Sequence, residues 1–138
     1  MELGIHALLA GAWIGCVLVE ALFERALLGS GRDKELILAR LHRKVDLYIE
    51  GPLLAGVVVT GAMMVSMMPI DGLLKAKLAF AVTAILANIW CIWLVRLRLG
   101  HAEAGRWEEF ERVDHSQHRW GAVVMIGLLG AATIGLWR

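Results

Sequence analysis

The sequence has 138 residues, a length typical of a single domain. Hydrophobic residues make up 59% of it and its mean hydropathy is +0.66, which is too apolar for an ordinary soluble domain of this length. The net charge of +1 gives no basis for nucleic-acid binding, so we expect no nucleic-acid partner.

Four apolar stretches predict four transmembrane helices. A helix needs about 20 residues to cross about 30 Å of hydrocarbon. The expected bounds are about 4–28, 46–68, 73–98 and 115–137, and the last span needs its more polar start to reach this length. We therefore predict an all-α fold, an integral membrane four-helix up-down bundle in which residues 1–138 form one domain. The start lacks a basic segment, so we do not expect the first helix to be a cleaved signal peptide.

Lysine and arginine are unevenly distributed among the predicted connections. Six lie in the first connection (25–44) and five in the third (96–119), whereas the second has only Lys75 and Lys77. Because positive residues remain in the cytoplasm, we expect both termini on the periplasmic side of a bacterial inner (cytoplasmic) membrane. The protein would then be a multi-pass protein whose first partner is the lipid bilayer.

Each predicted helix carries a stripe of polar or small residues at spacings of three and four. A charge at mid-depth in a membrane costs about 2.5–3.5 kcal/mol and usually faces the bundle interior. The stripes are therefore expected to face inward. In chain order they are His6, Ala10, Trp13, Val17, Glu20 and Glu24; then Asp46, Glu50, Val57, Gly61, Met64 and Met68; then Lys77, Ala81, Ala84, Asn88, Cys91 and Val95; and finally Glu111, His115, His118, Ala122 and Met125.

In an antiparallel bundle these stripes bring four carboxylates and two imidazoles to the cytoplasmic half. The carboxylates require compensating positive charge. Protons, a metal ion or one of the arginines Arg25, Arg43 and Arg119 would supply it. The same ligand count occurs in di-iron and di-manganese carboxylate proteins, although their Glu-x-x-His spacing is absent here. Mixed nitrogen and oxygen ligands suit iron, manganese or zinc better than copper(I). We predict a metal site formed by Glu20, Glu24, Asp46, Glu50, His115 and His118.

Two other interpretations of these residues remain open. In the first, the residues form interhelical ion pairs or are solvated at the helix ends, and the protein is a structural or assembly subunit. In the second, they form a proton relay. Small residues allow close helix packing within one bundle or between protomers of a homo-oligomer. Those considered for such contacts are Gly11, Gly15, Gly56, Gly61, Gly127 and Gly130.

The periplasmic half contains a second group of candidate ligands. A neutral imidazole such as His6 is able to ligate haem iron, but no partner histidine is expected opposite it. Thioethers suit copper(I), although methionines in apolar helices usually serve as packing. The methionines concerned are Met63, Met64, Met67 and Met68.

Several segments resemble a known family. They are "HALLAGAW" from His6 to Trp13, "HRKVDLYIEGPLLAGVVVTG" with Pro52 and Gly61, and "DGLLKAKLA", which contains Lys77. Their layout over the first three helices resembles the HemJ-type protoporphyrinogen oxidases and, more loosely, the CopD-type copper-resistance membrane domain.

The resemblance implies a four- or five-helix membrane fold, association with haem b and oxidation of a tetrapyrrole, with His6 and Lys77 as the positions that carry over. The family's arginine low in the first helix has no counterpart here unless Arg25 serves. The acidic pairs and the histidines of the fourth helix are not part of the family pattern.

We therefore predict a small inner-membrane protein that binds one or two transition-metal ions inside the bundle, for redox chemistry or metal transfer. Its further partner would be a small lipophilic substrate or a metal ion, and whether it is a membrane oxidoreductase stays open. The alternatives are a haem-b oxidoreductase of HemJ type that uses His6 and Lys77, and a structural or assembly subunit.

Overall fold

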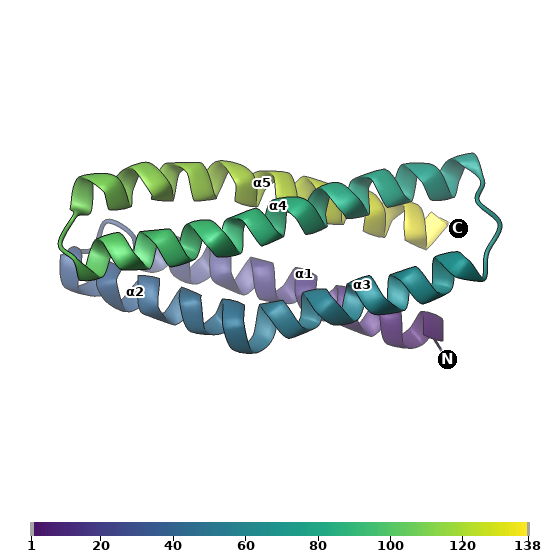
Figure 1. The fold of residues 1–138 in the computed structure, drawn as a ribbon, viewed down its shortest axis with the longest axis horizontal. Coiled ribbons are helices and arrows are strands. Elements are labelled where there is room, and N and C mark those ends of the chain that lie inside the picture. The colour runs from purple at the N-terminus through teal and green to yellow at the C-terminus, as the bar shows by residue number, and fades with distance from the viewer. Residues whose placement is uncertain (1, 138) are drawn as a thin grey trace.

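The computed structural model describes residues 2–137, and these contain helices and turns but no strand. The elements are α1 (Glu2–Leu27), α2 (Arg32–Val45), η1 (Asp46–Glu50), α3 (Gly51–Ser66), α4 (Gly72–Glu103) and α5 (Trp107–Trp137). Because α2, η1 and α3 follow one another without a break, the chain forms four long rods that alternate in direction (Figure 1). Each rod is long and apolar enough to cross a membrane. The predicted all-α four-helix architecture is confirmed.

The four rods pack unequally. The pair α4 and α5 makes the most extensive contact, α1 packs mainly on α3, and α2 packs on α4. Contact between α1 and α5 is sparse. Both termini lie at the same end of the bundle, and the turns that follow α1 and α4 lie at the other end (Figure 1).

The second rod begins at Arg32, one 14-residue helix earlier than the predicted start at residue 46. Most of the predicted first connection is therefore helical, and the actual turn is confined to residues 28–31. Helix α2 is strongly amphipathic and buries Glu35, Leu38, Ala39 and His42. Its many charges lie on the opposite face. The mean hydropathy of the segment is therefore low, as it is in a loop, although the segment folds as a helix.

The turn between α4 and α5 is also short and covers residues 104–106. Gly105 has a φ of 73°, a conformation that favours glycine, and it separates the two helices. Gly100 lies inside α4. Helix α5 begins at Trp107, so the third predicted connection is also mostly helical.

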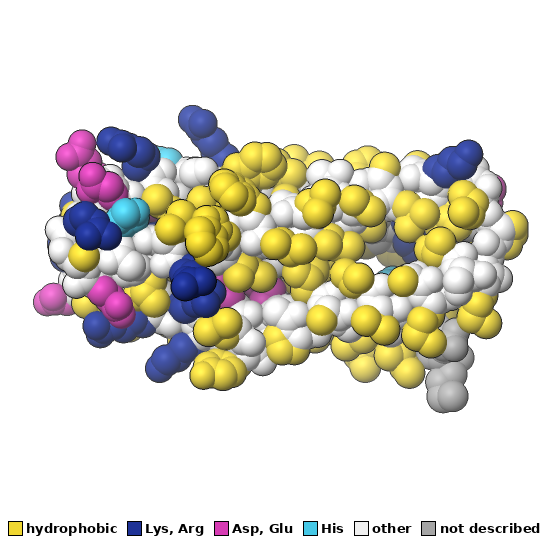
Figure 2. All heavy atoms as spheres, in the orientation of Figure 1, with side chains coloured by type: hydrophobic (Ala, Val, Ile, Leu, Met, Phe, Trp, Pro, Cys, Tyr) yellow, Lys and Arg dark blue, Asp and Glu magenta, His cyan; other side chains and the backbone are white. Residues whose placement is uncertain are grey.

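The surface divides into an apolar body and a charged end. Hydrophobic side chains cover the middle of the bundle, and charged side chains gather at the end opposite the termini (Figure 2). Large aliphatic residues project from every rod, among them Leu8, Leu22, Val59 and Ile126, each more than half exposed. A surface of this kind is suited to lipid contact rather than to water.

Helix α5 is rotated relative to its predicted stripe. Its buried side chains are Phe110, Asp114, Gln117, Val124, Gly127 and Leu128. Four members of the predicted stripe are exposed instead, namely Glu111, His115, His118 and Ala122. The true inward face lies one residue earlier in the sequence, which is a rotation of about 100° in an α-helix.

Close contact between α4 and α5 explains this rotation. A Cβ atom at Gly127 would lie 2.8 Å from the Phe80 carbonyl oxygen and 2.9 Å from the Ala84 Cβ. Only glycine fits there, so Gly127 must face α4. By contrast, a Cβ at Gly11 or Gly15 would meet no atom within 4 Å, so these two glycines make no close contact inside the bundle.

Candidate functional site

A wide helical turn positions two of the carboxylates. In η1 the Gly51 amide donates to the carbonyl of Asp46, five residues earlier, instead of the usual four. Pro52 has no amide hydrogen and leaves the carbonyl four residues before it without its helical donor, which favours a local distortion. Asp46 and Glu50 are buried at the two ends of this turn, and the three residues between them are exposed.

The centre of the cluster is the imidazole of His42. Its Nε2 is paired with Glu20 Oε2 and lies 3.6 Å from Asp46 Oδ1. All three residues are buried, with 2–6% of their surface exposed. One helix turn separates His42 from Asp46, and one more separates Asp46 from Glu50, so a single face of the second rod supplies three of these groups.

Glu24 orients the imidazole from the opposite side. Its Oε1 lies 2.5 Å from His42 Nδ1. A carboxylate accepts a hydrogen bond but donates none, so Nδ1 carries a proton. By the same argument Nε2 donates a second proton to Glu20 Oε2, and a metal ion bound between Glu20 and Asp46 would take the place of that proton. Metal-binding histidines in proteins usually show this arrangement, in which a carboxylate holds the nitrogen that does not bind the ion.

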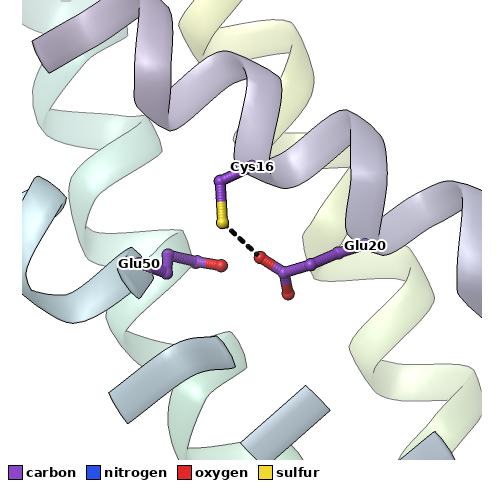
Figure 3. A group of neighbouring side chains, drawn as sticks. All are labelled: Cys16, Glu20 and Glu50. Atoms are coloured by element: carbon purple, nitrogen blue, oxygen red, sulfur yellow. Dashed lines mark hydrogen bonds between the residues drawn. The ribbon is translucent and has the colours of Figure 1, made fainter. Parts of the chain in front are cut away.

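A second group of potential ligands lies on the other side of Glu20. The Cys16 thiol donates to Glu20 Oε1 at 3.3 Å, and the Glu50 carboxylate faces both side chains (Figure 3). One ligand atom from each of the three lies within 4.8 Å of the others, and the same holds for Glu20, His42 and Asp46. Glu20 therefore stands between two adjacent groups, with one carboxylate oxygen directed at each.

Arg98 neutralises a different part of the cluster. This fully buried guanidinium donates to both carboxylate oxygens of Glu24, at 2.6 and 2.9 Å, and to Asp114 Oδ1 at 2.7 Å. The compensating arginine is thus on α4. The predicted candidates Arg25, Arg43 and Arg119 make no ion pair with the cluster among residues 2–137.

Arg98 also occupies a third group of potential metal ligands. Glu24, Asp114 and His118 form a third group of closely spaced ligand atoms. The Arg98 Nη1 already contacts both carboxylates of that group, so a cation there would face a guanidinium at hydrogen-bond distance. We therefore assign Glu24 and Asp114 to the arginine.

Three carboxylates remain without a permanent cation. Within residues 2–137, Glu20 and Asp46 form ion pairs only with His42, and Glu50 forms none. Each is buried, and Asp46 Oδ2 has no hydrogen-bond partner among the described residues. Buried carboxylates are retained only when protonated, paired or bound to a metal. Metal–oxygen and metal–nitrogen bonds of 2.0–2.2 Å place two ligand atoms up to about 4.4 Å apart, and the 3.6 Å between His42 Nε2 and Asp46 Oδ1 lies within that range.

The predicted ligands are only partly brought together. Glu20, Glu24, Asp46 and Glu50 converge. His118 is half exposed at the margin of the cluster, with Nε2 at 3.9 Å from Glu24 Oε2. His115 is exposed and makes no contact with the cluster in the described chain, because α5 is rotated as described above.

His6 and Lys77 lie elsewhere in the bundle. The His6 Nδ1 is 2.8 Å from the Thr60 hydroxyl, and its ring occupies the space that Gly61 leaves beside it. The Lys77 amine packs against Gly135 in the last turns of α5. Of the methionines, Met63 and Met67 are 47% and 71% exposed, so they do not converge on His6.

Sequence reasoning missed four members of the cluster. They are Cys16, His42, Arg98 and Asp114. Three of them continue a predicted stripe at helical spacing: Cys16 lies four residues before Glu20, His42 four before Asp46, and Arg98 three after Val95. Asp114 does not, because it lies on the rotated inward face of α5. Both His42 and Arg98 fall in segments that the charge pattern predicts as cytoplasmic connections.

Comparison of this chain with protein-family models, with curated proteins and with solved structures finds no match. The resemblance to HemJ-type and CopD-type proteins therefore stays a prediction.

Proposed function

We propose that this is a membrane protein that binds one or two transition-metal ions beside Glu20. The observation that carries the proposal is that three buried carboxylates, which have no arginine or lysine partner in residues 2–137, converge beside one oriented imidazole. Glu20, His42 and Asp46 would hold one ion, and Cys16, Glu20 and Glu50 a second. Carboxylate and imidazole ligands favour iron, manganese or zinc.

We further propose a bacterial inner membrane as its location, with both termini on the periplasmic side. The charged end of the bundle contains the turns 28–31 and 104–106 and most of the lysines and arginines (Figure 2). The positive-inside rule assigns such an end to the cytoplasm.

Among the possible roles, redox chemistry is favoured over metal transfer. A transfer path would need polar groups from the cluster to the opposite end of the bundle. The cluster is instead followed by an apolar core that includes Trp13, Leu54, Val57, Val124 and Leu128. The bound metal would supply electron transfer or Lewis acidity. The chain's own groups would hold it, with Glu24 fixing the direction of His42.

Metal analysis of the protein purified in detergent tests this proposal. We expect about one or two equivalents of iron, manganese or zinc per chain, and their loss in Glu20→Gln. The matched control is Glu111→Gln, which changes an exposed glutamate on α5 and should keep the metal. Helical circular dichroism verifies that both variants are folded.

Other results of the same preparation would overturn the proposal. A visible spectrum with a strong Soret band that His6→Ala removes and Glu20→Gln leaves unchanged would favour the haem alternative. Protein that is folded, colourless and free of bound metal, even after incubation with each ion, would favour the structural subunit.

A further inference from the structure

Four arginines surround the bundle at the level of the cluster, one on each of the four rods. We call them the arginine ring, and they are Arg25 on α1, Arg43 on α2, Arg96 on α4 and Arg119 on α5. Each lies within two positions of a residue of the cluster, and these neighbours are Glu24, His42, Arg98 and His118. The last three each have an atom within 3.9 Å of a Glu24 carboxylate oxygen. Since two residues of a helix rise only about 3 Å, the four arginines share one level of the bundle.

The ring arginines have no carboxylate partner among residues 2–137. None of the four makes an ion pair or a side-chain hydrogen bond within that range. Arg25, Arg96 and Arg119 are exposed, and Arg43 is half-buried. Their guanidinium groups are therefore free to bind an acceptor from outside the chain.

The arginines nearer the turns 28–31 and 104–106 differ from the ring, because each has a partner within the chain. The pairs are Arg32 with Glu111 (2.9 Å), Arg40 with Glu103 (3.4 Å), Arg112 with Glu108 (3.9 Å) and Arg106 with His101 (3.1 Å). These four side chains are exposed as well, so burial does not explain the difference. It is expected if the ring meets acceptors that its surroundings supply. Arginine is the side chain best suited to hold a phosphate, through two parallel hydrogen bonds.

Tryptophans lie directly on the apolar side of the ring. The Arg96 guanidinium lies over the Trp93 ring, 5.4 Å from its centroid, and Trp120 follows Arg119 toward the apolar body. Trp93 is 45% and Trp120 is 42% exposed. Tryptophan is enriched at the membrane–water interface, between the head groups and the hydrocarbon. The sequence of arginine, tryptophan and then aliphatic side chains along the surface therefore matches that of phosphates, interface and hydrocarbon in a bilayer.

We propose that the arginine ring binds the phosphates of anionic phospholipids around the bundle. Phosphates are the acceptors that a bilayer presents at this level. Anionic lipids such as phosphatidylglycerol are favoured over zwitterionic ones, because their head group has no ammonium to offset the charge of the phosphate. The proposal depends on the surface of the bundle alone and holds whether or not Glu20 carries a metal ion.

Binding of this kind also fixes the depth of the metal ligands. Asp46 follows Arg43 by three residues and Glu20 precedes Arg25 by five. At 1.5 Å per residue, these two carboxylates would lie about 5–8 Å below the phosphates rather than in the middle of the hydrocarbon. Most of α2 and the first turns of α5 would then project into water, in agreement with their many exposed charges.

Native mass spectrometry in detergent tests the proposal with phosphatidylglycerol and phosphatidylcholine that have the same acyl chains and are offered in equal amounts. The parent protein should retain phosphatidylglycerol at least about fivefold more than phosphatidylcholine. Glycerol phosphate carries the phosphate without acyl chains and should not displace the bound lipid. Equal retention of the two lipids would overturn the proposal. Displacement by glycerol phosphate would identify a soluble ligand instead of a lipid and would overturn it too.

Two matched variants locate the bound lipid. The ring variant combines Arg25→Gln, Arg43→Gln, Arg96→Gln and Arg119→Gln, and the control variant combines Arg32→Gln, Arg40→Gln, Arg106→Gln and Arg112→Gln. Both remove four positive charges, so net charge alone does not distinguish them. The preference for phosphatidylglycerol should disappear in the ring variant and equal the parent's in the control variant. An undiminished preference in the ring variant, or an equal loss in both, would overturn the proposal.

Smaller variants make the same comparison where a fourfold substitution prevents folding. Arg96→Gln with Arg119→Gln should lower the preference, and Arg106→Gln with Arg112→Gln should leave it unchanged; the opposite result would overturn the proposal. Helical circular dichroism verifies that each variant is folded. The metal content of the ring variant, expected to equal the parent's, reports on the metal site separately.

Discussion

Arg98 on α4 holds Glu24 on α1 through both terminal nitrogens, with Nη2 at 2.6 Å from Oε1 and Nη1 at 2.9 Å from Oε2. The same guanidinium contacts Asp114 on α5 and lies 5.6 Å from the Phe110 ring. One fully buried side chain thus ties three helices together. It also removes Glu24 and Asp114 from the set of groups free to bind an ion.

Replacing Arg98 by methionine should destabilise the protein strongly. The change leaves Glu24 and Asp114 buried without their cation, and breaking a buried pair in this way typically costs about 3–5 kcal/mol. Thermal unfolding in detergent measures the effect. The control is Arg40→Met, whose ion pair with Glu103 is about half exposed and should contribute about 1 kcal/mol or less. Partial recovery is expected in the triple variant Arg98→Met, Glu24→Gln and Asp114→Asn. Equal stability of the two single variants would contradict this role for Arg98.

Three of the histidines near the charged end, His42, His115 and His118, should differ in their effect on bound metal. His42→Gln should lose the metal, because His42 supplies the only buried imidazole of the cluster in the described chain. His115→Gln should keep it, since this side chain is exposed. His118→Gln should also keep it, because Arg98 occupies the neighbouring Glu24 and Asp114. The measurement is the number of metal equivalents per chain. Loss of the metal in His115→Gln would show that α5 is rotated differently about its axis, with His115 facing the cluster.

Glu24→Gln should weaken metal binding without abolishing it. Glu24 does not contact the ion in our proposal but holds His42 through Nδ1. Loss of such an orienting partner typically lowers metal affinity about 10–100-fold. Competition with a chelator of known affinity measures the change. An affinity equal to the parent's would refute the orienting role, and a complete loss of binding would place Glu24 among the direct ligands.

Gly127→Ala should separate α4 from α5. The added methyl group would meet the Phe80 carbonyl and the Ala84 side chain at under 3 Å, and overpacking of this kind costs about 1–3 kcal/mol. Gly15→Ala is the control, because its Cβ would meet no atom within 4 Å and alanine favours a helix by about 0.5–1 kcal/mol. The midpoint of thermal unfolding should therefore fall in Gly127→Ala and rise in Gly15→Ala. An unchanged midpoint in Gly127→Ala would show that the α4–α5 contact is looser than described.

Helix number and helix type followed from local properties. Apolar runs of about 20 residues require backbone hydrogen bonds within the segment, so composition alone predicted four membrane-length helices. The inward placement of Glu20, Glu24, Asp46 and Glu50 followed from spacing and from the cost of exposing charges to lipid. Burial of all four carboxylates agrees with that argument.

Amphipathic segments at the charged end were harder to predict. Residues 32–45 and 107–114 are rich in charges because one face meets water or headgroups, and hydropathy averages both faces together. Their helical character appears only in the spacing of a few buried residues, such as Leu38, His42 and Phe110.

The sequence by itself determined that this chain forms four apolar helices and that its internal carboxylates point inward, because both depend on composition and spacing within a single segment. Only the tertiary structure decided which cations meet which carboxylates. The pairing of Arg98 with Glu24 and the choice of His42 over His115 depend on how each helix is rotated about its axis. That rotation is set by contacts between helices, such as Gly127 against Phe80, which no single segment encodes.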